Sequence, residues 1–288
     1  MSTKSILLLA CVSWVLLFSR VGEAASPVTI ASSAPNLTEL VFSMGLGSQL
    51  IARSSACDYP PEVARLPVIG DFGRPNLETL EQIKPNVFLA TDLEKPGAVE
   101  QLRRMGINVL LLPCESWSQL MTAATEVGRA AGEPARATNW IGRMSLRRTM
   151  LEKRVADFYA GRIRPRVYVE VWSDPPTTVG TNTFLNDIVT LAGGRNIAAN
   201  LRGRYIPISS EWVVEQNPQV IVLAHMPQAG SVSSVGRRIG WSQIEAVQKG
   251  LICTNIPPDL LLRPGPRLID GAEALANWLM NRANDVSR

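Results

Sequence analysis

The sequence has 288 residues, a formal net charge of +4 and 46% hydrophobic residues. A charge this small, without a run of basic residues, argues against a nucleic-acid or membrane-surface partner, and the length allows one large domain or two of ordinary size. Only 6% of the residues are aromatic, so the core must be largely aliphatic and clustered aromatic residues indicate a local function.

The first 24 residues have the pattern of a secretory signal peptide. They contain an apolar run over residues 6–18, and Gly22 and Ala24 place small residues before a cleavage site after position 24. The run is shorter than the roughly 17–25 residues of a membrane-spanning helix. We therefore expect an exported protein, with lipidation of Cys11 in the phrase Leu-Leu-Ala-Cys as the alternative.

The first half of the remaining chain predicts strands that alternate with helices. A strand-like segment at 28–32 precedes a helical pattern from Leu37 to Met44, which glycines end, and consecutive prolines make the loop at 58–61 rigid. Further strands are expected at 50–52, 86–90 and 107–112, and further helices at 78–84 and 102–105. Strands that are apolar throughout indicate a parallel sheet covered on both faces.

Residues 134–160 predict one long linker helix. The segment lacks an internal proline, and Trp140, Met144 and Leu151 fall at helical spacing. A stiff helix that packs on both halves should permit little closure. We divide the chain into a signal peptide at 1–24, an N-terminal α/β lobe at 25–133, this helix, and a C-terminal α/β lobe at 161–288.

The second half repeats the plan of the first. Its expected strands are 166–172, 220–224 and 251–256, its helices are 183–191 and 244–249, and a proline-rich loop lies at 173–176. One phrase is shared directly. Glu78 precedes Pro85 by seven positions and Glu211 precedes Pro218 by the same interval, and an apolar run follows each proline. Each copy predicts a short helix, a stop and a buried strand, so the duplication implies two similar lobes with a cleft between them.

A series of short motifs in the first half is specific in combination. They are Ala34-Pro35-x-x-Thr38-Glu39, Asp58-Tyr59-Pro60-Pro61, Gly70, Pro75-Asn76-Leu77-Glu78 and Lys84-Pro85. In this order they resemble the class III periplasmic substrate-binding proteins of ABC importers, which carry cobalamin, ferric siderophores or haem. The similarity covers residues 27–280 and is greatest to the cobalamin-binding members.

The resemblance implies an α/β fold of two similar lobes with parallel sheets, joined by one backbone helix. It implies a monomeric periplasmic protein without catalysis or cofactor, which captures a corrinoid between its lobes and delivers it to a permease dimer. A ferric siderophore or haem is the alternative ligand. In the family a Glu on each lobe docks onto permease arginines, and the matching residues are Glu78 and Glu211. The plainer alternative is that both are ordinary carboxylates at helix starts.

Ligands of open α/β sheets bind beyond the carboxyl ends of the strands. Flat aromatic side chains facing one another there suit a large planar ligand. Trp172 could equally belong to the core, because strand residues alternate between faces. The predicted ligand-binding residues, some of them also matched by the resemblance, are Tyr59, Phe72, Trp172, Tyr205 and Asp259.

The single histidine, His225, follows a predicted strand and is expected at the rim of the cleft. There it would be either a solvated side chain or an axial ligand of the metal in the bound chelate. Several arginines also lie near strand ends or cleft loops, and an anionic ligand would be favoured if they converge. They are Arg53, Arg74, Arg202, Arg204 and Arg263.

The remaining chemical signals are weak. Cys57, Cys114 and Cys253 are odd in number after the leader and show no zinc-like spacing, so we expect small buried hydrophobic residues. The sequence contains no complete dinucleotide-binding, GxSxG, P-loop or HExxH motif. A secreted enzyme is therefore the alternative from another functional class.

Overall fold

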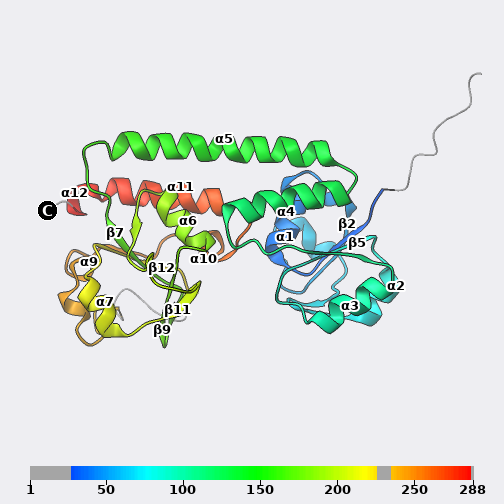
Figure 1. Cartoon of the computed structure of the whole chain (residues 1–288), viewed down its shortest axis with the longest axis horizontal. Coiled ribbons are helices and arrows are strands. Elements are labelled where there is room, and N and C mark those ends of the chain that lie inside the picture. Colours follow the sequence, from blue (N-terminus) through cyan, green and yellow to red (C-terminus); the bar gives the residue numbers. More distant parts are fainter. Residues whose placement is uncertain (1–26, 226–234, 287–288) are drawn as a thin grey trace, which may run out of the picture.

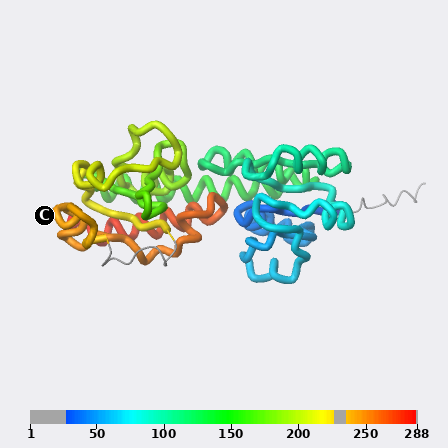
Figure 2. The backbone as a smooth tube through the Cα atoms, turned by 90° about the horizontal axis from the view of Figure 1, so that it is seen from below, coloured from blue at the N-terminus to red at the C-terminus, as the bar shows by residue number. Residues whose placement is uncertain are grey.

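The computed structural model describes residues 27–225 and 235–286, so the predicted signal peptide and Cys11 lie outside the described residues. Two α/β lobes lie along the long axis of the molecule, and helix α5 (Pro134–Phe158) runs over both (Figure 1). The perpendicular view shows the same two bodies side by side (Figure 2). The predicted fold class is confirmed. In the described ranges, no helix has the length and apolar character needed to cross a bilayer.

A parallel four-stranded sheet with the order β2-β1-β5-β6 forms the centre of the N-terminal lobe. The central strands are buried on both faces because helices cover both sides. Its strands are β1 (Ile30–Ser32), β2 (Leu50–Arg53), β5 (Val87–Ala90) and β6 (Asn108–Leu111). Its α-helices are α1 (Pro35–Ser43), α2 (Leu77–Ile83), α3 (Pro96–Arg104) and α4 (Trp117–Ala130).

The C-terminal lobe has the equivalent order, β10-β7-β12-β13, so its sheet repeats the connectivity of the first. Its parallel strands are β7 (Arg166–Glu170), β10 (Arg195–Asn196), β12 (Val220–Leu223) and β13 (Ile252–Cys253). Its α-helices are α6 (Phe184–Leu191), α7 (Ser210–Gln216), α9 (Glu245–Gln248), α10 (Pro258–Leu262), α11 (Leu268–Asn281) and α12 (Ala283–Val286).

The repeated phrase forms the same structure in both lobes. Helices α2 and α7 begin at the side-chain caps Asn76 and Ser209, each of which accepts a backbone N–H of the first turn. Both helices end at a residue in the left-handed region, Lys84 with φ 48° and Asn217 with φ 43°. The proline that follows cannot continue the helix, and the chain enters β5 or β12, the equivalent central strands.

The predicted strand at 166–172 is too long. The parallel strand ends at Glu170, because the N–H of Val171 bonds to the carbonyl of Thr177 and the chain turns into an antiparallel hairpin. This hairpin belongs to a separate small sheet that the sequence did not predict. The sheet contains β8 (Trp172–Ser173), β9 (Pro176–Val179) and β11 (Tyr205–Pro207). A separate hairpin in the N-terminal lobe contains β3 (Gly70–Asp71) and β4 (Arg74–Pro75).

The main hydrophobic core runs through both lobes. It includes side chains of α1 and α4 on one side and of α6 and α11 on the other, and α5 joins them through buried residues such as Trp140, Met144 and Leu151. Because the two lobes share this core, large rotations between them would expose apolar surface. The arrangement is consistent with a stiff connection and a cleft of nearly fixed width.

Candidate ligand-binding cleft

A pocket of about 390 Å³ lies between the lobes, next to the carboxyl ends of the central strands. Both lobes contribute to it. Its lining residues are Asn36, Phe72, Thr91, Asp92, Leu93, Pro113, Cys114, Glu115, Phe184, Arg204, Tyr205, Leu262 and Pro264. The position follows the rule for open α/β sheets, in which the strand ends and the loops after them form the binding crevice.

Two of the predicted aromatic residues share this pocket. Phe72 lies in the hairpin between β3 and β4 and is 40% exposed, and Tyr205 begins β11 and is 44% exposed. The hydroxyl of Tyr205 donates to Oε2 of Glu115 in the opposite lobe at 3.1 Å. Burial and the neighbouring Glu115 carboxylate raise the pKa of Tyr205, so the phenol stays protonated and remains a donor.

The charged residues of the pocket form a second contact between the lobes. Arg204 lies 3.8 Å from the Glu115 carboxylate and 3.9 Å from that of Asp92. Neither acid was among the predicted site residues. The position of ligands beyond strand ends is a sequence signal for both acids, since Asp92 follows β5 and Glu115 follows β6 within a few residues.

Tyr59 and Asp259 lie at a different junction between the lobes. The centre of this junction is Glu39 of α1, whose side chain is 2% exposed. Arg267 binds the Glu39 carboxylate through two hydrogen bonds of 2.8 and 2.6 Å, and its guanidinium also lies 4.3 Å from the centre of the Tyr59 ring. Arg263 joins Glu39 to Asp259 at 3.3 and 3.2 Å. Tyr59 therefore lines another hollow, of about 470 Å³, which shares no lining residue with the cleft pocket.

Trp172 is neither buried in the core nor part of the described pocket lining. It is 58% exposed in β8, and its indole N–H donates to the carbonyl of Asp174 at 2.8 Å. The five predicted arginines also do not converge. Arg204 is the member of that set that lines the described pocket, whereas Arg53 bonds to the carbonyls of Val63 and Ser54 in its own lobe.

The expectation that His225 is exposed at the cleft rim is wrong. Its side chain is 3% exposed, and Nε2 lies 3.0 Å from Glu170, which ends β7 and is fully buried. Arg238 also binds this carboxylate, at 2.5 and 2.8 Å. The ends of β7 and β12 lie side by side, but the contact with the Glu170 carboxylate holds the imidazole in the interior. This position does not support an axial-ligand role, because His225 is not among the described residues that line the cleft pocket.

The three cysteines are free and buried, in agreement with the prediction of small hydrophobic residues. Burial raises the pKa of Cys114 and Cys253 to about 12, so these thiols stay protonated at neutral pH. Among the described residues, no cluster of three or more His, Cys, Asp or Glu side chains could hold a metal ion.

Glu78 and Glu211 are both exposed, each in the first turn of its helix. Helices α2 and α7 lie in different lobes, on the side of the molecule away from α5 (Figure 1). Hydrogen bonds from the backbone N–H of Glu211 and from Ser209 lower the pKa of Glu211, which favours its charged form. The two carboxylates therefore occupy equivalent first-turn positions, in helices that lie on one side of the protein.

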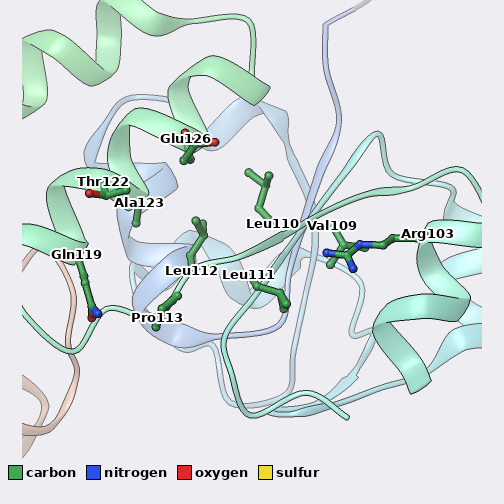
Figure 3. Close-up of a pocket in the computed structure, with 10 residues that line it drawn as sticks. All are labelled: Arg103, Val109, Leu110, Leu111, Leu112, Pro113, Gln119, Thr122, Ala123 and Glu126. Carbon is green, nitrogen blue, oxygen red and sulfur yellow. The ribbon is translucent and has the colours of Figure 1, made fainter. Parts of the chain in front are cut away.

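A further groove, of about 430 Å³, follows the edge strand β6 (Figure 3). Leu110 of this strand and Leu112, which follows it, point toward α4, whereas Leu111 points away. All of its lining residues lie between Arg103 and Glu126, in the N-terminal lobe. Unlike the cleft pocket, it is therefore lined by one lobe alone.

Comparison with known proteins agrees with this architecture. The family model described as periplasmic binding protein matches residues 30–256. An ABC transporter substrate-binding lipoprotein of Bacillus subtilis, YvrC, is 30% identical over 255 residues, covering 87% of this chain and 79% of that protein. The vitamin B12-binding protein of Pectobacterium carotovorum is 29% identical over 268 residues, covering 88% of this chain and 89% of that protein.

Solved structures share the fold. The vitamin B12-binding protein BtuF of Vibrio cholerae has a TM-score of 0.75 at 23% identity, covering 90% of this chain and 98% of that chain. The haem-binding protein HutB of the same species has a TM-score of 0.77 at 21% identity, covering 88% and 98%. The chain belongs to the periplasmic binding protein family and has its class III architecture.

Proposed function

We propose that this protein captures a corrinoid in the cleft between its lobes and delivers it to an ABC importer. The observation that carries the proposal is the pocket built from both lobes, with partly exposed aromatic rings from each, Phe72 and Tyr205, over a largely apolar lining. Such rings offer flat contact surface to a macrocycle. The vitamin B12-binding relatives, which align over almost the whole chain, support the same ligand class.

Because a corrinoid is a large macrocycle, its entry requires the cleft to open locally. A volume of about 390 Å³ lies near the lower end of the range for ligand pockets, roughly 300–1,000 Å³. The hydrogen bond between Tyr205 and Glu115 spans the pocket, so this contact must separate for the ligand to enter. Because the two lobes share one core, we expect this opening to come from movement of the loop before β11 and not from rotation of the lobes.

Haem is the second candidate, because solved structures with this fold include haem-binding proteins. A haem or ferric siderophore with free carboxylates calls for unpaired arginines. The arginine of the described pocket, Arg204, faces two acids, and Arg263 is bound to Glu39 and Asp58. This pairing favours the corrinoid.

We further propose that Glu78 and Glu211 dock onto the permease and that the leader directs the chain to the periplasm. The matched first-turn positions of the two carboxylates, and the shared side of helices α2 and α7, support the docking role. An arginine on the partner could bind each carboxylate in a bidentate manner.

Calorimetric titration with cyanocobalamin, haem and a ferric hydroxamate tests the ligand. We expect sub-micromolar binding of cyanocobalamin alone. Phe72→Ala and Tyr205→Ala should each weaken it by about tenfold, since an aromatic contact is worth roughly 1 kcal/mol or more. Trp172→Ala is the matched control and should leave the affinity unchanged. Binding of haem in place of cyanocobalamin would contradict the corrinoid proposal.

A further inference from the structure

Three charged side chains meet at the pocket wall. Asp92 and Glu115 come from the N-terminal lobe and Arg204 from the C-terminal lobe, with nitrogen–oxygen distances of 3.9 and 3.8 Å. The Glu115 side chain is 20% exposed and the other two are about half exposed, at 52% for Asp92 and 48% for Arg204. Glu115 is therefore the most enclosed charge of the three.

The balance of these charges is negative. In the described lining of the pocket, two carboxylates face one guanidinium, and no other charged side chain is present. Tyr205 supplies one donor to Glu115, and each carboxylate has further lone pairs available. A ligand entering this wall meets mainly hydrogen-bond acceptors.

We infer that Asp92 and Glu115 select ligands that present uncharged hydrogen-bond donors, such as primary amides, and reject ligands that present carboxylates at the same place. The inference rests on the proposed function only for the identity of the ligand. Amide N–H groups can donate to both acids in charge-assisted hydrogen bonds. A carboxylate would be repelled by both acids and would have to compete with them for Arg204.

Matched ligands test this directly. Cyanocobalamin and its monocarboxylic acid derivatives differ only in one side-chain amide, which the derivatives carry as a carboxylate. We expect the wild-type protein to bind cyanocobalamin at least about tenfold more tightly than the derivative whose acid reaches this wall. In the D92N/E115Q variant the difference should fall to about threefold or less. An unchanged preference in that variant would overturn the inference.

Two controls identify the groups responsible. In the D92N/E115Q variant, Arg204 no longer faces two carboxylates and is the expected partner of the ligand carboxylate. Adding Arg204→Met should therefore remove any gain in affinity for the carboxylate-bearing ligand. Glu100→Gln changes an exposed acid on α3 that pairs with Arg104, and it should alter no affinity ratio. Both substituted acids keep an acceptor oxygen and a similar shape, and thermal unfolding checks that the variants remain folded.

A second ligand pair separates this inference from the corrinoid proposal. If the wild-type protein binds no cobalamin, the proposed ligand is wrong, and haem is compared with its dimethyl ester instead. The charge selection then predicts tighter binding of the ester to the wild type and loss of that preference in D92N/E115Q. Equal binding of acid and ester by the wild type would reject the selection itself.

Discussion

At the scale of single residues, Glu170 is a buried carboxylate at the end of β7. Its carboxylate is fully buried and contacts Arg238, His225 and the hydroxyl of Tyr168. Burial alone would raise the pKa of Glu170, but the hydrogen bonds from Arg238 and His225 outweigh it and hold the pKa below the usual value of 4.5. The carboxylate is therefore charged in the folded protein at neutral pH.

This environment predicts acid sensitivity. A carboxyl group with a lowered pKa contributes stability above its unfolded value, and that contribution is lost as the pH falls through the folded value. Chemical unfolding should therefore show the wild type losing stability below about pH 4.5. Glu170→Gln should lower the free energy of unfolding by about 3 kcal/mol at pH 7, because Arg238 loses its buried partner. On acidification, this variant should lose less stability than the wild type does. The exposed change Glu100→Gln should reproduce neither effect.

At the scale of the element, two helical glycines, Gly128 of α4 and Gly142 of α5, have different surroundings. Gly142 is exposed in the middle of α5, and an added Cβ would meet nothing within 4 Å. Gly128 of α4 packs directly against α5, where an added Cβ would lie 2.4 Å from that of Ala137. The same substitution should therefore act in opposite directions on the two helices.

Gly142→Ala should stabilise the protein by roughly 0.5–1 kcal/mol, because alanine loses less backbone entropy in a helix. Gly128→Ala should destabilise it by about 1–3 kcal/mol through overpacking. Thermal unfolding measures both, and each variant controls for the other. Stabilisation by Gly128→Ala would mean that α4 and α5 pack less closely than in this structure.

At the scale of the whole molecule, the separation of the two lobes is set by several connections at once. The shared core, the long helix α5 and the buried junction of Glu39 with Arg263 and Arg267 all span both lobes. A rigid body of this kind holds α2 and α7 at a constant separation, which two-point docking on a permease dimer requires.

Charge reversal at both proposed docking residues tests this arrangement. Glu78→Lys with Glu211→Lys should weaken association with the permease by at least about a hundredfold, since each lysine would face the partner's arginines. Affinity for the ligand should not change, because both residues lie outside the cleft pocket. Glu152→Lys on α5, on the far side of the molecule, is the matched control. Parallel loss of ligand affinity would indicate misfolding rather than docking.

The local elements could be predicted from sequence because their signals are local. The helix of Pro134–Phe158 follows from its spacing of apolar residues, and the stops before Pro85 and Pro218 follow from proline's missing N–H. The strand through Trp172 was predicted wrongly, because a partner strand decided where it ended. Of the five predicted ligand-binding residues, the described pocket lining includes Phe72 and Tyr205 but not Tyr59, Trp172 or Asp259.

The sequence by itself thus determined the two similar lobes and the helix that joins them, and it supplied the prediction of the edge at which a ligand would bind. Only the tertiary structure decided which side chains meet there. Tyr205 reaches Glu115 across 90 positions, and Arg267 reaches Glu39 across 228. His225 turned inward for the same reason, because Glu170, 55 positions away, supplies its partner. Contacts between segments so distant in the chain depend on how the lobes pack, and no periodicity or spacing in the sequence records them.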